Sequence, residues 1–205
     1  MERLSSLGYA IAIEVVNAAE YGVPQKRRRL IAVGTRQGRP RFSFPVPTHG
    51  PRGNRQFVAS GAALSRVPDA ATVNESRVTY AKRPDLRPSP YDGHLFNGGG
   101  RAIDLCAPAH TILASAGGNK THFLDLHDEV PAYHKYLLGG GWPRAGSLDG
   151  GRRLSPEESA ALQTFPEGML FAGSRSSKYA QIGNAVPPTL AKALGKALAS
   201  TLQGQ

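Results

Sequence analysis

Cysteine and long apolar runs are nearly missing from this sequence. Its 205 residues include one cysteine, Cys106, which excludes an internal disulfide framework and a multi-cysteine zinc site. No apolar run approaches the roughly 20 residues that span a bilayer. The first residues, MERLSSLGYAIAIEVV, carry acids and lack the order of a secretory signal peptide. We therefore expect a soluble, intracellular protein of the cytoplasm with no membrane partner.

Metal clusters and phosphate loops are not indicated either. The 6 histidines are scattered, and although His122 and His127 flank Asp125, no tight spacing of metal ligands recurs. The glycine triplets that begin at Gly98 and Gly139 lack the Lys-Ser or Lys-Thr pair that a phosphate-binding loop needs. We therefore expect no bound metal and no loop of this kind.

Acids are scarce relative to bases. The net charge is +10, and between Tyr21 and Val67 the chain has ten cations and no acid. Nine of these ten are arginines, whose planar guanidinium suits bidentate phosphate contacts. This favours nucleic acid over an anionic membrane as the polyanionic partner, and the competing interpretation is a solvated basic surface. The cations are Lys26, Arg27, Arg28, Arg29, Arg36, Arg39, Arg41, Arg52, Arg55 and Arg66.

The N-terminal segment predicts two strands. Residues 10–16, AIAIEVV, and 30–35, LIAVGT, are short, apolar and partly β-branched. A loop marked by Gly22 and Pro24 joins them and carries four consecutive cations. Two adjacent buried strands of this kind suit the edge of an α/β sheet, with the basic loop at one end of it.

The periodicity of apolar residues is weak from about residue 36 to 151 and becomes regular again after that. The middle segment predicts irregular β-rich structure, including a short strand, a glycine turn and a second short strand within TILASAGGNKTHFLDL, residues 111–126. Ser155, Pro156 and Glu158 form a capping-box pattern that predicts a helix start. A last helix is expected over 187–202, with an apolar stripe that packs back onto the sheet.

Three segments, in order, resemble the C-terminal motifs of the cytosine-5 DNA methyltransferases. The first, AAEYGVPQKRRRLIAVG, is similar to a basic Gln-x-Arg-x-Arg motif, and the second, RRLSPEESAALQTFPEG, to the family's next motif. The third, QIGNAVPPTLAKALGKAL, is similar to its closing Gly-Asn-Ala-Val-Pro motif. The matching positions are Gln25, Arg27 and Arg29; Arg152, Leu154, Glu158, Leu162, Gln163, Phe165 and Pro166; and Gly183, Asn184, Ala185, Val186 and Pro187.

The resemblance implies a fold and a division of the chain. The fold would be α/β: the C-terminal part of a Rossmann-like methyltransferase sheet plus an irregular, β-rich target-recognition region. Residues 1–40 would form the edge strands and basic loop of the catalytic domain. Residues 41–150 would form the target-recognition region, and residues 151–205 would return to the catalytic domain as the closing helices.

The resemblance also implies a function that this chain performs only in part. The family transfers a methyl group from S-adenosylmethionine to cytosine in a specific sequence of double-stranded DNA, within restriction–modification systems. Its cofactor loop, Pro-Cys loop and Glu-Asn-Val motif are not found here, and Cys106 follows leucine rather than proline. We therefore expect the catalytic nucleophile on an N-terminal half or partner subunit. The alternatives are a catalytically inactive DNA-binding module and an RNA-methylating relative.

The same resemblance suggests DNA-contacting residues. Arg27 and Arg29 alternate where the second strand begins, so both should point toward the DNA, and Gln25 should brace the loop. Thr111, before the Gly117–Gly118 turn, matches a phosphate-contacting position, although a plain hairpin turn would account for the pattern equally well. Candidate base readers in the loops are Asn97, Arg101, Asn119 and Lys120.

The closing motif suggests part of a cofactor site. Asn184, Ala185 and Val186 would contribute one wall of the S-adenosylmethionine pocket. The alternative is that Asn184 acts as the N-cap of the last helix, and both roles can hold at once. Arg152 and Glu158 are expected to tie the recognition region to the catalytic domain.

Overall fold

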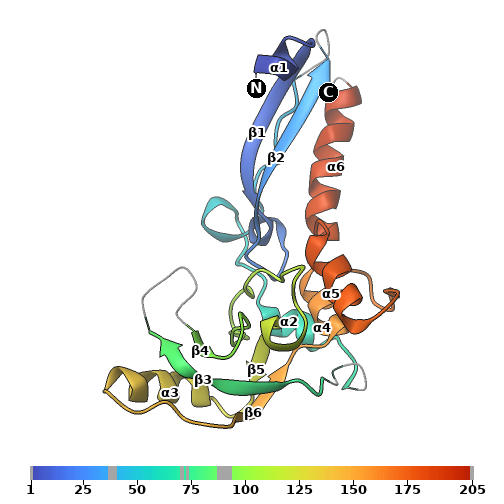
Figure 1. Cartoon of the computed structure of the whole chain (residues 1–205). Helices are drawn as coiled ribbons and strands as arrows, with labels where there is room; N and C mark the ends of the chain where they lie inside the picture. Colours follow the sequence, from blue (N-terminus) through green and yellow to red (C-terminus); the bar gives the residue numbers. More distant parts are fainter. Residues whose placement is uncertain (1, 37–40, 70–71, 73, 87–93, 204–205) are drawn as a thin grey trace.

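The computed structural model describes residues 2–36, 41–69, 72, 74–86 and 94–203. Figure 1 shows a long hairpin at one end, a four-stranded sheet at the other, and short helices between them. Arg39 of the basic stretch lies outside the described residues. The helices, strands and 3-10 helices (η) are α1 (Glu2–Ser5), β1 (Tyr9–Asn17), η1 (Ala18–Tyr21), β2 (Arg28–Arg36), η2 (Gly50–Arg52), α2 (Ser60–Leu64), β3 (Arg77–Asp85), β4 (His94–Phe96), η4 (Gly118–Lys120), β5 (Phe123–Asp125), α3 (Glu129–Leu138), β6 (Ser147–Arg153), α4 (Pro156–Leu162), α5 (Arg175–Asn184) and α6 (Pro188–Gln203).

The two predicted N-terminal strands are confirmed as an antiparallel hairpin, β1–β2, paired from Tyr9↔Arg36 to Asn17↔Arg28. Side chains alternate between its two faces. On one face Val16 is fully buried and packs with Leu190 of α6, which runs beside the hairpin in Figure 1.

The opposite face of the hairpin is apolar and open, so the expectation that both strands are buried is wrong. Val15 and Leu30 form a cross-strand pair and are 46% and 67% exposed. Nothing in the described part of the chain covers these side chains. We call this surface the outer hairpin face; it comprises Tyr9, Ile11, Ile13, Val15, Leu30 and Ala32.

The second sheet has the strand order β4-β3-β6-β5, and its pairings are antiparallel. Its core is an aromatic cluster in which the rings of Tyr80 and Tyr133 pack edge to face and the ring of Phe96 is tilted against both. β6 continues past residue 150 to Arg153 and leads directly into α4. The β-rich character expected for the middle of the chain is confirmed, with short strands and register shifts in place of long ladders.

One predicted strand is wrong. Residues 111–116 are irregular, whereas the second predicted strand of that segment exists as β5. The backbone groups of Ile112 bond side chains of the basic loop: its N–H donates to Gln25 Oε1 at 3.0 Å, and its carbonyl accepts from Arg27 at 3.1 Å. These polar groups are therefore satisfied without a neighbouring strand.

The C-terminal helices follow the prediction closely. The capping box at Ser155 and Glu158 is present in both directions, with Pro156 in the first turn of α4. α6 begins one residue later than expected, and its stripe packs on the hairpin only in its first half, since Leu198 and Leu202 are 39% and 63% exposed. No helix in the described residues is both long and apolar enough to cross a membrane.

Candidate nucleic-acid interface

Arg27 lies beneath the basic loop instead of on its surface. It is 2% exposed, and its guanidinium donates to the carbonyl oxygens of Ile112 at 3.1 Å and Gly183 at 2.7 Å. Burial, with a contribution from Arg29, lowers the pKa of Arg27 to about 10. Its Nε has no hydrogen-bond partner among the described residues. Arg27 therefore joins three segments that are distant in sequence.

The prediction that Arg27 and Arg29 point the same way is wrong. Arg29 is exposed and donates to the carbonyl of its neighbour Arg28 at 2.8 Å. The strand begins at Arg28, so Arg27 still belongs to the loop and does not follow the alternation of β2. Lys26 and Arg28 are exposed as well, so these two and Arg29 are the cations of this loop that can reach a ligand.

The basic loop is held against residues 109–112. Gln25 is fully buried, and besides its bond to Ile112 its amide nitrogen donates to Leu162 O at 3.4 Å. The prediction that Gln25 braces the loop is confirmed. Thr111 is half-buried, and its hydroxyl donates to Lys26 O at 2.6 Å. Thr111 is thus fixed next to the exposed cations.

The four predicted base readers come together on two loops that touch through their backbones. We call residues 97–101 and 117–121 the loop pair. Gly100 N–H donates to Asn119 O at 3.2 Å. A Cβ on Gly98 would lie 2.1 Å from Asn119 O, and one on Gly100 would lie 2.0 Å from Thr121 O. Glycine therefore permits this approach. Asn97, Asn119 and Lys120 are exposed at the contact, and Arg101 is half-buried.

The Gly117–Gly118 turn has the backbone that its sequence suggests. Both residues have positive φ, 142° and 50°, which side chains rarely tolerate. Gly117 N–H donates to the hydroxyl of Thr121 at 3.0 Å, and η4 follows directly. The turn is therefore a defined structure next to the predicted readers Asn119 and Lys120.

His122 links the loop pair to Thr111, and sequence reasoning missed it. Its Nδ1 accepts from the backbone N–H of Arg101 at 3.1 Å, and its Nε2 lies 3.1 Å from Thr111 O, to which it donates. These partners fix the neutral tautomer. Burial, then the nearby His110, Arg101 and Arg153, lower the pKa of His122 to about 4 despite the bond to Thr111. A cavity of about 200 Å³ opens beside Arg101, and His94 and His110 also line it.

The predicted cofactor residues lie where α5 meets α6. Asn184 is the last residue of α5, Ala185 follows it, and Val186 is 50% exposed. The alternative that Asn184 caps α6 is wrong, because α6 starts at Pro188. The N-terminus of α6 is satisfied elsewhere: Thr189 N–H donates to Thr164 Oγ1 at 3.1 Å.

Gly183 is required for the contact between α5 and residues 112–114. A Cβ there would lie 2.4 Å from Ala114 N and 2.4 Å from Leu113 C. The exposed side chains of Asn184 and Val186 therefore stand on a backbone that is fixed from below by Gly183 and Arg27.

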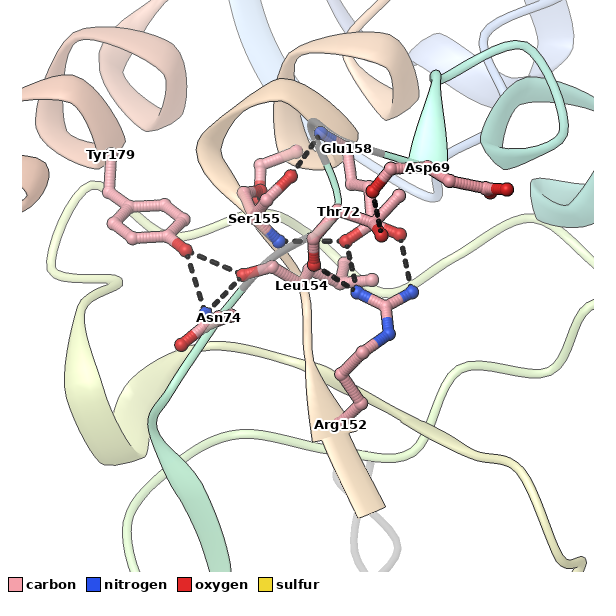
Figure 2. A network of polar contacts seen from close by, with 9 residues as sticks. Asp69, Thr72, Asn74, Arg152, Leu154, Ser155, Glu158 and Tyr179 are labelled. Carbon is pink, nitrogen blue, oxygen red and sulfur yellow. Dashed lines mark hydrogen bonds and ion pairs between the residues drawn. The ribbon is translucent and has the colours of Figure 1, made fainter. Parts of the chain in front are cut away.

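Figure 2 shows the polar network that joins the four-stranded sheet to α4 and α5. Arg152 makes a bidentate ion pair with Glu158, at 2.8 and 2.7 Å, and donates to Thr72 O at 2.7 Å. The hydrogen-bonded partner raises the pKa of Arg152. Asn74 and Tyr179 both donate to Leu154 O, at 2.6 and 2.5 Å. Thr72 and Asn74, which lead into the sheet, and residues 152–154, which lead out of it, are thereby linked to α4 and α5. Arg152 and Glu158 make the link to α4.

The described residues contain no metal cluster, and the single cysteine lies on the surface. No group of three His, Cys, Asp or Glu side chains in the described residues could hold a metal ion. Cys106 is exposed, and its backbone N–H donates to Asp104 Oδ1 at 2.8 Å in a surface loop.

Comparisons with known proteins agree with the family resemblance. The family model for C-5 cytosine-specific DNA methylases matches residues 1–200. The Type II methyltransferase M.NgoFVII of Neisseria gonorrhoeae is 33% identical over 196 residues, which cover 93% of this chain and 50% of that protein. M1.HphI of Haemophilus parahaemolyticus is 29% identical over 199 residues, which cover 96% and 50%. The chain spans about half the length of the curated relatives it matches.

Solved structures resemble it along nearly its whole length. Schizosaccharomyces pombe Dnmt2 methyltransferase superposes with a TM-score of 0.60 at 13% identity, covering 97% of this chain and 59% of that one. A variant of Spodoptera frugiperda DNMT2 gives a TM-score of 0.58 at 13% identity, covering 98% and 60%. These likenesses concern the fold, and they confirm the α/β methyltransferase fold that the three motifs predict.

Proposed function

This chain belongs to the C-5 cytosine-specific DNA methylase family, and we propose that it is the C-terminal, DNA-reading part of a DNA (cytosine-5-)-methyltransferase. The whole enzyme would methylate cytosine within a specific duplex sequence, in a restriction–modification system. The single observation that carries this proposal is the family match along residues 1–200, against relatives of about twice the length.

The outer hairpin face is evidence that this chain binds a second part of the enzyme. It is an apolar sheet face on which side chains such as Val15 and Leu30 are exposed, and contiguous apolar surface of this kind marks an interaction site. We propose that the N-terminal half of the enzyme, in the same polypeptide or as a separate subunit, packs on this face. The N-terminal half would also supply the reactive thiol, since the single cysteine here has no preceding proline.

The family takes its methyl group from S-adenosylmethionine, which supplies an electrophilic methyl when bound. Asn184, Ala185 and Val186 fit one wall of that site, because a polar amide and an apolar side chain are exposed together on a fixed backbone. We propose that Asn184 would offer hydrogen bonds and that Val186 would exclude water there. This chain binds and orients; the covalent step on the base belongs to the second part.

Within this chain we propose a division between gripping and reading. Lys26, Arg28 and Arg29 would contact phosphates together with Thr111 and the Gly117–Gly118 turn, because all of them are exposed or half-exposed and Thr111 is bonded to Lys26. Arg27 and Gln25 would act beneath them by fixing the loop. The base readers would be Asn97, Arg101, Asn119 and Lys120, on the loop pair within residues 41–150.

Methyl transfer after mixing tests the proposal. The purified chain is combined with a family polypeptide that carries the Pro-Cys loop, in the presence of duplex DNA and radiolabelled S-adenosylmethionine. We expect 5-methylcytosine from the mixture and none from either polypeptide alone. A complex that forms, binds DNA and transfers nothing would favour the inactive DNA-binding module. Competition by transfer RNA, but not by duplex DNA, would favour an RNA substrate.

A further inference from the structure

Arg153 is a fully buried cation under the loop pair. It is the last residue of β6 and is 0% exposed. Its guanidinium donates to three carbonyl oxygens from three segments: Thr121 O at 2.6 Å, Arg77 O at 3.2 Å and Asn97 O at 3.5 Å. It also lies over the ring of Phe123, 5.8 Å from the centroid.

Arg153 has no carboxylate ion-pair partner among the described residues, and burial lowers its pKa. A buried cation of this kind is costly unless several acceptors satisfy it. The acceptors here are backbone carbonyls, one on β3 and two on the loops, so the energy of the buried charge depends in part on where those loops lie.

Two of the three acceptors belong to the loop pair. Asn97 begins its first loop and Thr121 ends its second. Between them Gly100 leaves room for the guanidinium, since a Cβ there would lie 2.6 Å from Arg153 Nη1. Arg153 therefore fixes the spacing of the two loops at the point where their backbones touch.

Neighbouring arginines have different partners here. Arg152 turns toward Glu158 and Thr72, in the network of Figure 2, while Arg153 turns into the four-stranded sheet. Arg152 thus joins the sheet to the helices, and Arg153 acts inside the sheet on the loops that carry Asn97, Arg101, Asn119 and Lys120.

We propose that Arg153 is a positioning residue for base selection: it holds the loop pair in the arrangement that lets exposed side chains on both loops read one DNA sequence. This inference rests on the proposed function. Arg153 itself is buried and touches no base, so its effect would pass through the loops. It should therefore govern which sequence is chosen more than how strongly phosphates are held.

Two variants and one control test the inference in the full chain. Arg153→Met removes the donors and keeps much of the volume, and Arg153→Lys keeps the charge with one donor group. Arg83→Met is the control, because Arg83 is an exposed cation on β3 of the same sheet. Thermal unfolding of each variant confirms that it is folded before the other measurements.

Amide hydrogen exchange reports on the loops without DNA. In Arg153→Met we expect protection in residues 97–101 and 117–121 to fall by about tenfold or more, as for a lost buried charge-assisted bond. Protection in β1 and β2 should not change, and Arg153→Lys should recover part of the loss. Equal protection in wild type and Arg153→Met would overturn the inference whatever DNA binding shows.

Selection from a randomised duplex library, with the partner half present, reports on reading. Arg153→Met should broaden the selected sequences while the salt dependence of binding stays the same, whereas Arg83→Met should leave the selected sequence intact. An unchanged sequence preference in folded Arg153→Met also overturns the inference. If hydrogen exchange shows looser loops in Arg153→Met but the wild-type chain selects no DNA sequence, the proposed function is overturned. The role of Arg153 in ordering the loops would then stand without it.

Discussion

Arg27 Nη2 donates to the carbonyl oxygen of Gly183 at 2.7 Å, across 156 residues of sequence. This bond joins the basic motif to the closing motif, and the second bond of Arg27, to Ile112, brings in the irregular segment before the Gly117–Gly118 turn. Gln25 adds the segment that ends α4 through Leu162. The three motifs found in the sequence therefore converge on one buried cluster, on which the exposed cations and the predicted cofactor residues stand.

Replacing Arg27 with alanine should destabilise the chain. The change would leave two buried carbonyl oxygens, those of Ile112 and Gly183, without their donors. Charge-assisted bonds of this kind suggest a loss of about 3 kcal/mol in the free energy of unfolding. Urea denaturation at neutral pH would measure it.

Arg29→Ala is the matched control for that variant. Its side chain is exposed, so stability should change by less than about 0.5 kcal/mol. Its effect should be on DNA: the slope of log affinity against log salt should become shallower by about one unit. If Arg27→Ala unfolds at the same urea concentration as wild type, the buried linking role of Arg27 is wrong.

Local sequence patterns predicted several secondary-structure elements well and the directions of single side chains poorly. The hairpin, the capping box and α6 follow from local patterns, because alternation, capping and helical periodicity are local. The burial of Arg27 depends on partners more than 80 residues away, and no local pattern reports them. Arg153 was missed for the same reason, since a second basic residue beside a motif arginine looks like surface charge.

Gly100 and Gly99 form a matched pair for the backbone contact of the loop pair. A Cβ on Gly100 would lie 2.0 Å from Thr121 O, whereas one on Gly99 would have nothing within 4 Å. We expect Gly100→Ala to cost about 2 kcal/mol through forced separation of the loops, and Gly99→Ala to be neutral or slightly stabilising. Calorimetry of both variants would check this, and equal midpoints would contradict the close approach.

His122 predicts a pH dependence of stability. Its pKa in the folded chain, about 4, lies below the ordinary value of 6.5. Between those pH values the unfolded chain binds a proton that the folded chain does not, so stability falls as the pH is lowered through this range. The gap corresponds to about 3 kcal/mol, fully lost near pH 4.

The variant His122→Gln isolates that contribution from other titrating groups. It should be less stable than wild type at pH 7, because the bonds to Arg101 and Thr111 are disturbed. The difference between the two proteins should shrink as the pH falls from 6.5 to 4. Urea midpoints at intervals across this range would measure it, and a constant difference would mean that His122 titrates normally.

The outer hairpin face should decide assembly with the second half of the enzyme. Val15 and Leu30 are a directly opposed pair, so the double variant Val15→Lys, Leu30→Glu places opposite charges across the strands and preserves their pairing. We expect the variant to be folded and less prone to self-association than wild type, and to fail to form the active mixture. Sedimentation velocity and methyl transfer would measure the two effects.

Leu138→Glu is the control for this surface. Leu138 is 62% exposed, close to the 67% of Leu30, but it lies on α3, at the other end of the molecule in Figure 1. A general effect of removing exposed apolar surface would act on both variants alike. Loss of methyl transfer in the hairpin variant alone would locate the partner on β1 and β2. Equal activity in both would place the partner on another surface, since a charged pair at the centre of a buried sheet face would not be tolerated.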